Sequence, residues 1–251
     1  MDHFVFGGIS SMNFGLRIEK PRIAKKPKPR ITKVTVPGGN KDFIYREEGF
    51  DNVDVTYQTW YLERERELVL SRLGEISQWL SGGEYLTLSD SYDPDYFRLG
   101  YCREPLDPDI LLRCAAKQDI VFSCDPFRYF WDGENMVPFY YQTNTGFSRE
   151  FVNTGWPSMP LLEVVGTGKF TVKVETERGN KKESWKADFE ISGTMLVDSY
   201  EMETTENGNP ANHKKTGAGY PTLGTGNVSV NVKSTQGVLQ TVSIKPRWRT
   251  I

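Results

Sequence analysis

The chain has 251 residues and carries 31 lysines and arginines against 33 aspartates and glutamates, a net charge of −2. This balance excludes a histone-like basic nucleic-acid binder and an acidic disordered tail, and the length is sufficient for a sizeable hydrophobic core. Two histidines and three cysteines leave few residues for metal binding or nucleophilic catalysis. The composition is that of an ordinary globular protein.

The N-terminal segment lacks the pattern of a secretory signal peptide. Asp2 stands where such a signal carries positive charge, and two glycines interrupt the apolar run from Phe4 to Ile9. No segment approaches the roughly 18 consecutive apolar residues of a transmembrane helix. Cys102, Cys114 and Cys124 are odd in number and form no C-x-x-C pair, so we expect reduced thiols packed as small hydrophobic groups. These patterns predict synthesis in a cytoplasm.

Residues 17–33 form the first segment with a distinctive charge. They include eight basic residues and one acidic residue, and Pro21, Pro27 and Pro29 favour an extended chain over a helix. A strand is predicted at residues 53–60, where two sets of side chains alternate with a period of two.

An amphipathic helix is predicted between residues 62 and 80. Its apolar stripe has helical spacing and consists of Leu62, Val69, Leu73, Ile76 and Leu80. Gly82 and Gly83 supply a C-terminal stop signal. We expect this helix to pack on a sheet and to carry no catalytic residue.

An acidic segment at residues 84–109 follows the helix, with seven acidic and two basic residues. One interpretation is that this segment and the basic segment 17–33 are both solvated loops. The alternative is that the basic segment of one copy contacts the acidic segment of another, because complementary charge sets the register of assemblies. The candidate residues for this interface between copies are Arg22, Lys25, Lys26, Lys28, Arg30, Asp90, Asp93 and Asp95.

A domain boundary is predicted near residues 132–138, which divides the chain into residues 1–132 and 133–251. The second part has short alternating segments typical of strands, at residues 170–177, 185–191, 228–232 and 238–244. Turns are predicted between strands at Arg178-Gly179-Asn180, Ser192-Gly193, Gly224-Thr225-Gly226 and Gln236-Gly237. The spacing indicates an antiparallel β-sandwich, and the fold class is predicted as mainly β with one amphipathic helix.

No catalytic or cofactor-binding motif is present in the sequence. His3 and His213 have no cysteine nearby at the spacing of a zinc site, and the patterns of a nucleophile elbow and of phosphate-binding loops are absent. The aspartates that begin at Asp90 do not form an EF-hand, because Asp95 and Tyr101 occupy the positions of the required glycine and glutamate. We therefore predict no enzyme activity, no cofactor and no metal site.

Two other classes of function remain open for the second part of the chain. A carbohydrate-binding module would stack sugars on exposed aromatic faces, for which Trp156, Trp185 and Tyr200 are the candidates. Trp185 belongs to a strict alternation, so packing in the core competes with that role. A glycoside hydrolase would need two carboxylates, one with a raised pKa, from the group Asp198, Glu201, Glu203 and Glu206.

Short phrases spread over nearly the whole chain occur together in a characteristic order. They are Phe4-Val5-Phe6-Gly7-Gly8, Asn13-Phe14-Gly15-Leu16, Val34-Thr35-Val36-Pro37-Gly38-Gly39, Ser77-Gln78-Trp79-Leu80, Phe122-Ser123-Cys124-Asp125-Pro126-Phe127, Asn153-Thr154-Gly155, Gly166-Thr167-Gly168 and Lys245-Pro246-Arg247-Trp248-Arg249. Together they resemble the distal tail protein (Dit) family of long-tailed phages and prophages that infect Gram-positive bacteria. Gly39 stands where that family usually has an arginine, so any role of the arginine is not carried over.

This resemblance implies an N-terminal β-rich belt domain that forms a ring, usually a hexamer, and a C-terminal galectin-like antiparallel β-sandwich. It implies a structural hub at the virion tail tip that joins the tail tube to the tail-associated lysin or fibre. The expected partners are further copies of the chain, the tail tube protein and the lysin or fibre, without membrane insertion. DNA would pass through the ring without sequence-specific binding, so we expect neutral or acidic side chains in the lumen. The alternative function is a carbohydrate-binding module that recognises a host cell-wall glycan.

Overall fold

The computed structural model describes residues 2–22, 25–35, 37–62, 66–104, 109–112, 115–142 and 146–251. The chain divides into two compact units, an N-terminal unit up to Arg128 and a C-terminal unit from Tyr129 to Thr250. The boundary predicted between residues 132 and 133 falls in the 3-10 helix η2 (Trp131–Glu134), shortly after this division. Both units consist mainly of antiparallel strands, and the predicted fold class is confirmed.

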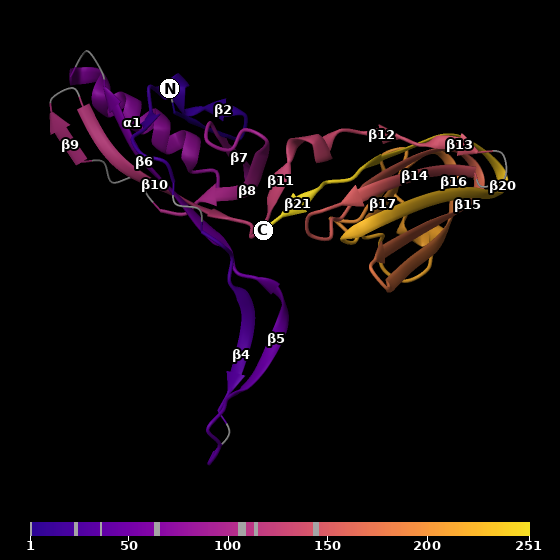
Figure 1. The fold of residues 1–251 in the computed structure, drawn as a ribbon. Helices are drawn as coiled ribbons and strands as arrows, with labels where there is room; N and C mark the ends of the chain where they lie inside the picture. The colour runs from indigo at the N-terminus through magenta and orange to yellow at the C-terminus, as the bar shows by residue number, and fades with distance from the viewer. Residues whose placement is uncertain are drawn as a thin grey trace. The chain divides into compact units, whose positions relative to one another are not determined.

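The N-terminal unit is an antiparallel sheet covered by a helix (Figure 1). The strands follow the order β2 (Ile9–Ser10), β1 (Phe4–Phe6), β7 (Leu86–Asp90), β8 (Tyr96–Cys102), β10 (Ala115–Cys124), β6 (Val53–Leu62) and β3 (Arg17–Ile18), with β9 (Asp109–Leu112) paired to β10. The 3-10 helix η1 (Ser11–Phe14) follows β2, and the Ser10 side chain caps it by accepting a hydrogen bond from the N–H of Met12.

The helix α1 (Arg66–Leu80) forms as the apolar stripe predicts. Strand β6 has the predicted alternation, so one of its faces is buried, and α1 contributes to the same core. The stripe residues that enter this core as fully buried side chains are Val69, Ile76 and Leu80. The prediction that Leu62 begins the stripe is wrong, because Leu62 ends β6 and is exposed.

Trp79 connects the helix to the sheet. Its ring stacks on Phe4 at a centroid distance of 5.7 Å and on Phe14 at 4.7 Å, and its indole N–H donates to the carbonyl of Phe6 at 3.3 Å. Phe4 in turn stacks on Tyr57 of β6 at 4.9 Å. Each such aromatic pair contributes about 0.5–1.5 kcal/mol beyond the burial of its area. The opening of the chain is therefore held between the helix and β6.

A separate hairpin lies between β3 and β6 in the sequence. It consists of β4 (Pro29–Val34) and β5 (Phe43–Phe50), which pair with each other and with no other strand of the described residues. The connecting turn includes Gly38 with φ of +78°, a conformation that favours glycine. Figure 1 shows the two strands as a ribbon of their own.

The C-terminal unit is a second antiparallel sheet, folded over its own core. Its strands follow the order β13 (Tyr140–Gln142), β14 (Gly146–Asn153), β20 (Gly226–Lys245), β15 (Leu161–Arg178), β16 (Lys181–Asp198), β17 (Glu203–Glu206) and β18 (Asn209–Pro210). The shorter elements of this sheet are β12 (Val137–Pro138), paired to β20, and β19 (Lys215–Thr216), paired to β16, and the 3-10 helix η3 (Asn212–Lys214) precedes β19. Strands β11 (Arg128–Phe130) and β21 (Arg249–Thr250) pair with each other and are not strands of this sheet.

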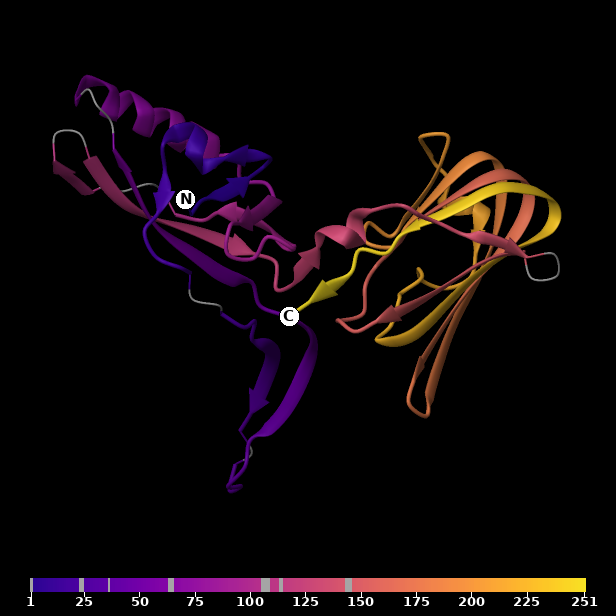
Figure 2. The same ribbon diagram turned by 45° about the horizontal axis from the view of Figure 1, so that its top comes forward.

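The long strands β15, β16 and β20 curve along their length (Figure 2). The turns predicted at Ser192-Gly193 and Gln236-Gly237 are wrong, because both lie inside continuous strands. Gly168 and Gly237 are paired across β15 and β20, with φ of +110° and +94°. A Cβ on Gly168 would lie 1.9 Å from a backbone oxygen of β20, so only glycine fits this close approach. The turn predicted at Arg178-Gly179-Asn180 does connect β15 to β16.

Because β15 bends, both of its halves contribute to one core. Leu162 and Val164 precede the bend, Phe170 and Val172 follow it, and all four belong to the same buried cluster. Phe170 stacks on Phe189, its partner in register on β16, at a centroid distance of 5.1 Å. The strands therefore enclose the core as an antiparallel β-sandwich.

Candidate assembly interface

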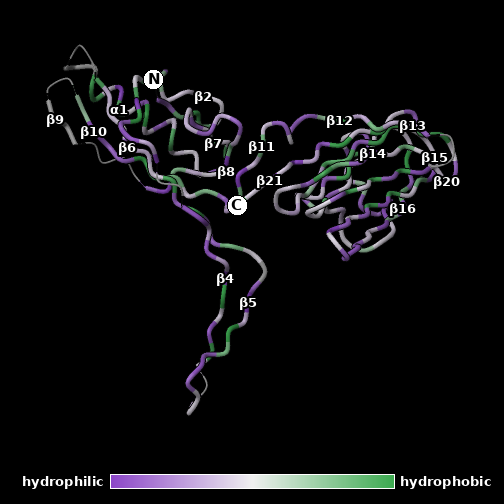
Figure 3. Tube along the Cα trace, viewed as in Figure 1, coloured by the Kyte–Doolittle hydropathy of each residue, from purple (hydrophilic) through white to green (hydrophobic). Residues whose placement is uncertain are grey.

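The β4–β5 hairpin exposes apolar side chains on both of its faces. The register places Val34 opposite Phe43 on one face and Lys33 opposite Ile44 on the other. Phe43 is 66% exposed, Ile44 60% and Tyr45 63%. Figure 3 shows hydrophobic stretches on both strands of the hairpin. An isolated two-stranded hairpin is marginally stable in water, and its unpaired edges and apolar faces are suited to contact with another chain.

The basic residues that precede the hairpin are exposed to solvent at its base. Lys25, Lys26 and Lys28 are exposed, and their ammonium groups form no ion pair with any described residue. Arg30, in β4, lies 3.3 Å from Asp51 in a solvent-exposed ion pair. The backbone is anchored here as well, because the N–H of Asp51 donates to the carbonyl of Lys28 at 2.9 Å. The described part of segment 17–33 therefore presents free positive charge beside the hairpin.

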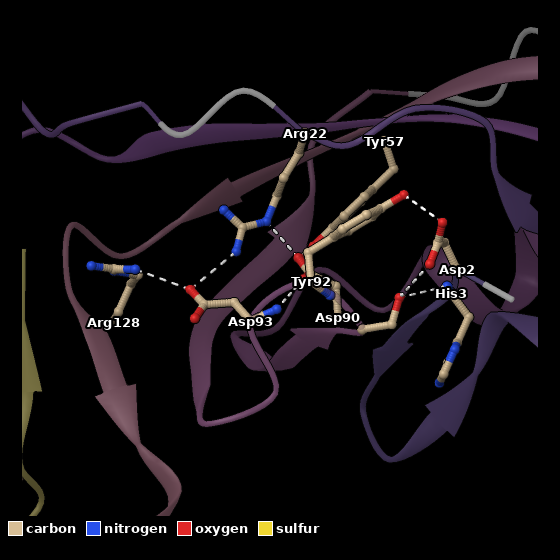
Figure 4. Close-up of polar contacts among 9 residues, drawn as sticks. Asp2, His3, Arg22, Tyr57, Asp90, Tyr92, Asp93 and Arg128 are labelled. Carbon is tan, nitrogen blue, oxygen red and sulfur yellow. Dashed lines mark hydrogen bonds and ion pairs between the residues drawn. The ribbon is translucent and has the colours of Figure 1, made fainter.

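Arg22 differs from these lysines because it is bound within the chain (Figure 4). Its guanidinium forms an ion pair with Asp90, and its Nη2 lies 3.5 Å from Oδ2 of Asp93. The hydroxyl of Tyr57 also donates to Oδ2 of Asp90, at 2.7 Å. Burial and the Asp90 carboxylate raise the pKa of Tyr57 well above its ordinary value, which keeps this phenol a donor.

The loop between β7 and β8 completes this network. The backbone N–H groups of Tyr92 and Asp93 donate to Oδ1 of Asp90 at 3.0 and 3.2 Å. Nη1 of Arg128 lies 3.0 Å from Oδ2 of Asp93, and the same guanidinium lies 4.8 Å from the ring centroid of Tyr96. Asp93 therefore bridges two arginines, and Asp90 accepts hydrogen bonds on both of its oxygens.

The residues predicted as an interface between copies fall into two groups. Arg22, Asp90 and Asp93 meet within one chain, whereas the lysines and Asp95 remain exposed. Charge segregation thus indicated which groups are complementary but not that some of them pair internally. Tyr57 and Arg128 belong to the network but are not among the residues predicted from the sequence. The sequence does contain an indication for Tyr57: a tyrosine at a buried position of an alternating strand requires a hydrogen-bond acceptor for its hydroxyl.

The two tryptophans proposed for sugar stacking have different surroundings. Trp185 lies opposite the buried Val174, packs against the core of the C-terminal unit, and donates its indole N–H to the carbonyl of Ala218 at 2.8 Å. Trp156 is 39% exposed, and its backbone forms an isolated antiparallel β-bridge with that of Arg249. Trp156 is therefore the better placed of the two for contact with a ligand.

Two adjoining grooves lie along strands of the C-terminal unit. One has a volume of about 600 Å³ and is lined in part by Glu150, Glu177, Lys182 and Asn227. The other, of about 450 Å³, is lined in part by Lys173, Lys186, Asn231 and Lys233, and both include Glu175. Together the two linings contain amide, carboxylate and ammonium groups. Such a mixture of donors and acceptors is suited to a neutral polar ligand.

The carboxylates proposed for glycoside hydrolysis form ion pairs instead of an acid and base pair. Burial opposes ionisation of Asp198, but two hydrogen bonds from Arg247 at 2.6 and 2.9 Å and the N–H groups of Glu201 and Tyr200 lower its pKa. A hydrogen bond from Lys214 lowers the pKa of Glu206. A general acid requires the opposite shift, so neither carboxyl is suited to that role.

Within the described ranges, no group of three or more histidine, cysteine, aspartate or glutamate side chains is arranged to hold a metal ion. No helix in the described part of the chain is long and apolar enough to cross a membrane. The surfaces that stand out are therefore the hairpin with its basic flank and the grooves of the C-terminal unit.

Comparison with solved structures identifies proteins of the same architecture, although no protein-family model and no curated protein matches the chain. The Dit protein (gp 19.1) of phage SPP1, described as a paradigm of the hub adsorption apparatus in phages that infect Gram-positive bacteria, matches with a TM-score of 0.70 at 15% identity. The match covers 97% of each chain.

Two structures of the phage P2 baseplate in its activated conformation also match. The structure with Ca has a TM-score of 0.53 at 7% identity, and the match covers 97% of each chain. The structure with Sr has a TM-score of 0.52 at 6% identity, and the match covers 95% of this chain and all of the other. The chain therefore has the fold of phage hub and baseplate proteins. More particularly, it is similar over almost its whole length to SPP1 Dit, so the resemblance noted in the sequence is confirmed at the level of the fold.

Proposed function

We propose that this chain is a structural hub protein of a phage or prophage tail tip, present in the virion and assembled in the cytoplasm of the host. The observation that carries this proposal is the shared two-unit fold, which matches SPP1 Dit over 97% of both chains. The described residues add no metal cluster that would favour an enzyme, and the ion-paired carboxylates Asp198 and Glu206 argue against hydrolysis.

In the proposed assembly, copies of the chain form a closed ring through their N-terminal units, with six as the expected number. The hairpin of one copy contacts the next copy and covers the apolar side chains that a single chain leaves in water. In a closed rotational ring each copy offers one surface and receives a different one, so a hairpin and its docking surface need not be alike. The exposed Lys25, Lys26 and Lys28 would contact acidic residues of the neighbour, with Asp95 as a candidate.

The ring would join the tail tube to the tail-associated lysin or fibre and allow DNA to pass through its lumen. Smooth passage requires few cations in the lumen, because each phosphate contact with a lysine or arginine strengthens binding. We therefore place the lysines at the contact between copies and neutral or acidic side chains in the lumen.

The ring is tested by native mass spectrometry and negative-stain microscopy of the full chain, alone and co-expressed with the neighbouring tail proteins. We expect closed rings for the wild type and loss of rings for the double variant Phe43→Ser, Ile44→Ser. Val152→Ser, which replaces an equally exposed apolar residue of the C-terminal unit, is the matched control and should retain rings. A monomer under both conditions, or rings that are unaffected by the hairpin variant, would overturn the proposal.

A second candidate function is glycan binding by the C-terminal unit, favoured by its polar grooves. A groove of about 600 Å³ has the size of a site for a small ligand. Binding on a glycan array that is lost in Asn227→Ala, with unchanged melting temperature, would support a site in the groove. Loss in Trp156→Ala instead would place the site at that exposed tryptophan, which does not line the groove. The variant Trp185→Ala tests folding more than binding, because that side chain packs against the core.

A further inference from the structure

A third arginine lies next to the network of Arg22 and Asp90 and is not neutralised by it. Arg98, in β8, is 7% exposed. Its Nη1 reaches the backbone carbonyls of Asp125 at 3.5 Å and Phe127 at 3.4 Å, which is beyond the usual range of N–H···O hydrogen bonds. Its Nε is buried and has no acceptor among the described residues. Buried guanidinium donors are normally satisfied, so this one requires an explanation.

Arg98 and the network line the same small cavity. Its volume is about 10 Å³, and its lining includes Arg22, Arg98, Arg128, Asp90 and Asp93. Three guanidinium groups and two carboxylates therefore surround it, with one positive charge in excess. Both carboxylates are already engaged by Arg22 and Arg128, and no described carboxylate lies within ion-pair distance of Arg98.

The charge on Arg98 cannot be removed by deprotonation, because a guanidinium stays protonated in proteins. Burial is the largest cause that lowers the pKa of Arg98, and the positive charges of Arg22 and Arg128 lower it further, whereas Cys124 and Tyr57 act in the opposite direction. A buried charge without a partner strongly destabilises the folded state. A negative group in the cavity would neutralise this charge.

We propose that this cavity binds one small monovalent anion of the size of chloride, held by Arg98 together with Arg22 and Arg128. The volume is about that required by a single species of the size of water, which is too small for a whole phosphate or sulfate ion. Guanidinium N–H groups are strong donors to anions, and the Nε of Arg98 supplies a donor without an acceptor. The ion links β8 to the segment that leads into the hairpin and to the end of the N-terminal unit, at Arg128.

The test compares the melting temperature of the full chain in sodium chloride and in sodium gluconate at equal ionic strength and neutral pH. Gluconate is too large for the cavity. We expect the wild type to melt a few degrees higher in chloride, with a saturable dependence on chloride concentration, because a ligand that binds only the folded state stabilises it. The difference should vanish in Arg98→Met. Arg103→Met, which removes an exposed arginine outside the cavity, is the matched control and should keep it.

A second measurement covers the case in which Arg98→Met fails to fold. Crystals of the wild type soaked in bromide should show an anomalous peak in the cavity, and Arg128→Gln, which alters its partly exposed rim, should raise the chloride concentration at half-saturation. Equal melting temperatures in the two salts, a chloride effect that persists in Arg98→Met, or a bromide soak without a peak would overturn the proposal.

Discussion

Arg22 and Asp90, 68 residues apart in the chain, form an ion pair in which the Asp90 side chain is 2% exposed and the Arg22 side chain 13%. Asp90 ends β7, within the sheet, whereas Arg22 lies in the segment between β3 and the hairpin. The pair therefore anchors the start of that segment to the sheet. It also removes two strong charges from the surface that other copies of the chain can contact.

Asp90→Asn should lower the free energy of unfolding by about 3 kcal/mol, because it leaves the buried Arg22 with only its longer ion pair to Asp93, which Arg128 shares. Urea denaturation followed by tryptophan fluorescence measures this change. The control Asp51→Asn breaks the exposed pair with Arg30 and should cost less than about 1 kcal/mol. Equal losses in the two variants would show that burial of the Arg22 pair has no special effect.

Charge reversal at the base of the hairpin should weaken assembly. The triple variant Lys25→Glu, Lys26→Glu, Lys28→Glu replaces attraction between copies with repulsion, so the fraction of rings should fall, most strongly at low salt. Native mass spectrometry over a salt series measures this fraction. Reversal of Lys173, Lys186 and Lys233 in the C-terminal unit changes the net charge equally and should leave the rings intact. An unchanged oligomer in the first variant rules out a role for these lysines.

Gly237→Ala should destabilise the C-terminal unit by about 3 kcal/mol or more. A Cβ at this position would lie 2.1 Å from the carbonyl oxygen of Thr167, and the residue has a positive φ. Gly179→Ala is the control: its φ is also positive, but no atom lies within 4 Å of the added Cβ, so a loss of about 1 kcal/mol is expected. Thermal melts by circular dichroism distinguish the two, and similar losses would contradict the close approach as the cause.

Cys124 should be inert to thiol reagents in the folded protein. Burial raises the pKa of its thiol to about 12, so at about pH 8 only about one molecule in ten thousand carries the reactive thiolate. Mass spectrometry after a timed pulse of iodoacetamide should find Cys124 unlabelled in buffer and labelled in urea. Cys102 is partly exposed and should react sooner, whereas Cys114 lies outside the described residues. Rapid labelling of Cys124 under native conditions would contradict its burial.

Asp198 should make the stability of the C-terminal unit sensitive to acid. Its pKa is lowered in the folded state, so the carboxylate stabilises the fold above the pKa of an unfolded aspartate, about 3.9. That contribution disappears as the pH falls from there through the lower folded pKa. Asp198→Asn should therefore melt below the wild type at neutral pH, and the gap should close in strong acid. A gap that stays constant down to low pH would show that the Arg247 ion pair is not its source.

Local patterns in the sequence determined the elements whose side chains meet the core in a simple period. The alternation in β6 and the stripe Val69, Ile76 and Leu80 predicted a strand and a helix, and both form because burial of one face rewards that spacing. The boundary between these two elements was predicted wrongly: Leu62 fits the helical stripe but belongs to β6. Where a strand leads towards a helix, one residue can fit the period of both elements. The packing of the residues around it then decides which element it joins.

Tertiary structure alone decided how the glycines and the charges are used. Gly237 is compatible with a turn or with a bend inside a strand, and the approach of β15 selects the bend. Segments 17–33 and 84–109 have opposite charge in any fold, but only the folded sheet brings Arg22 to Asp90 and leaves Lys25 in solvent. Composition and spacing therefore determined a mainly β scaffold with polarised charge. The physical reason they go no further is that pairing energies depend on distance and burial, which residues far apart in sequence acquire only when the chain folds.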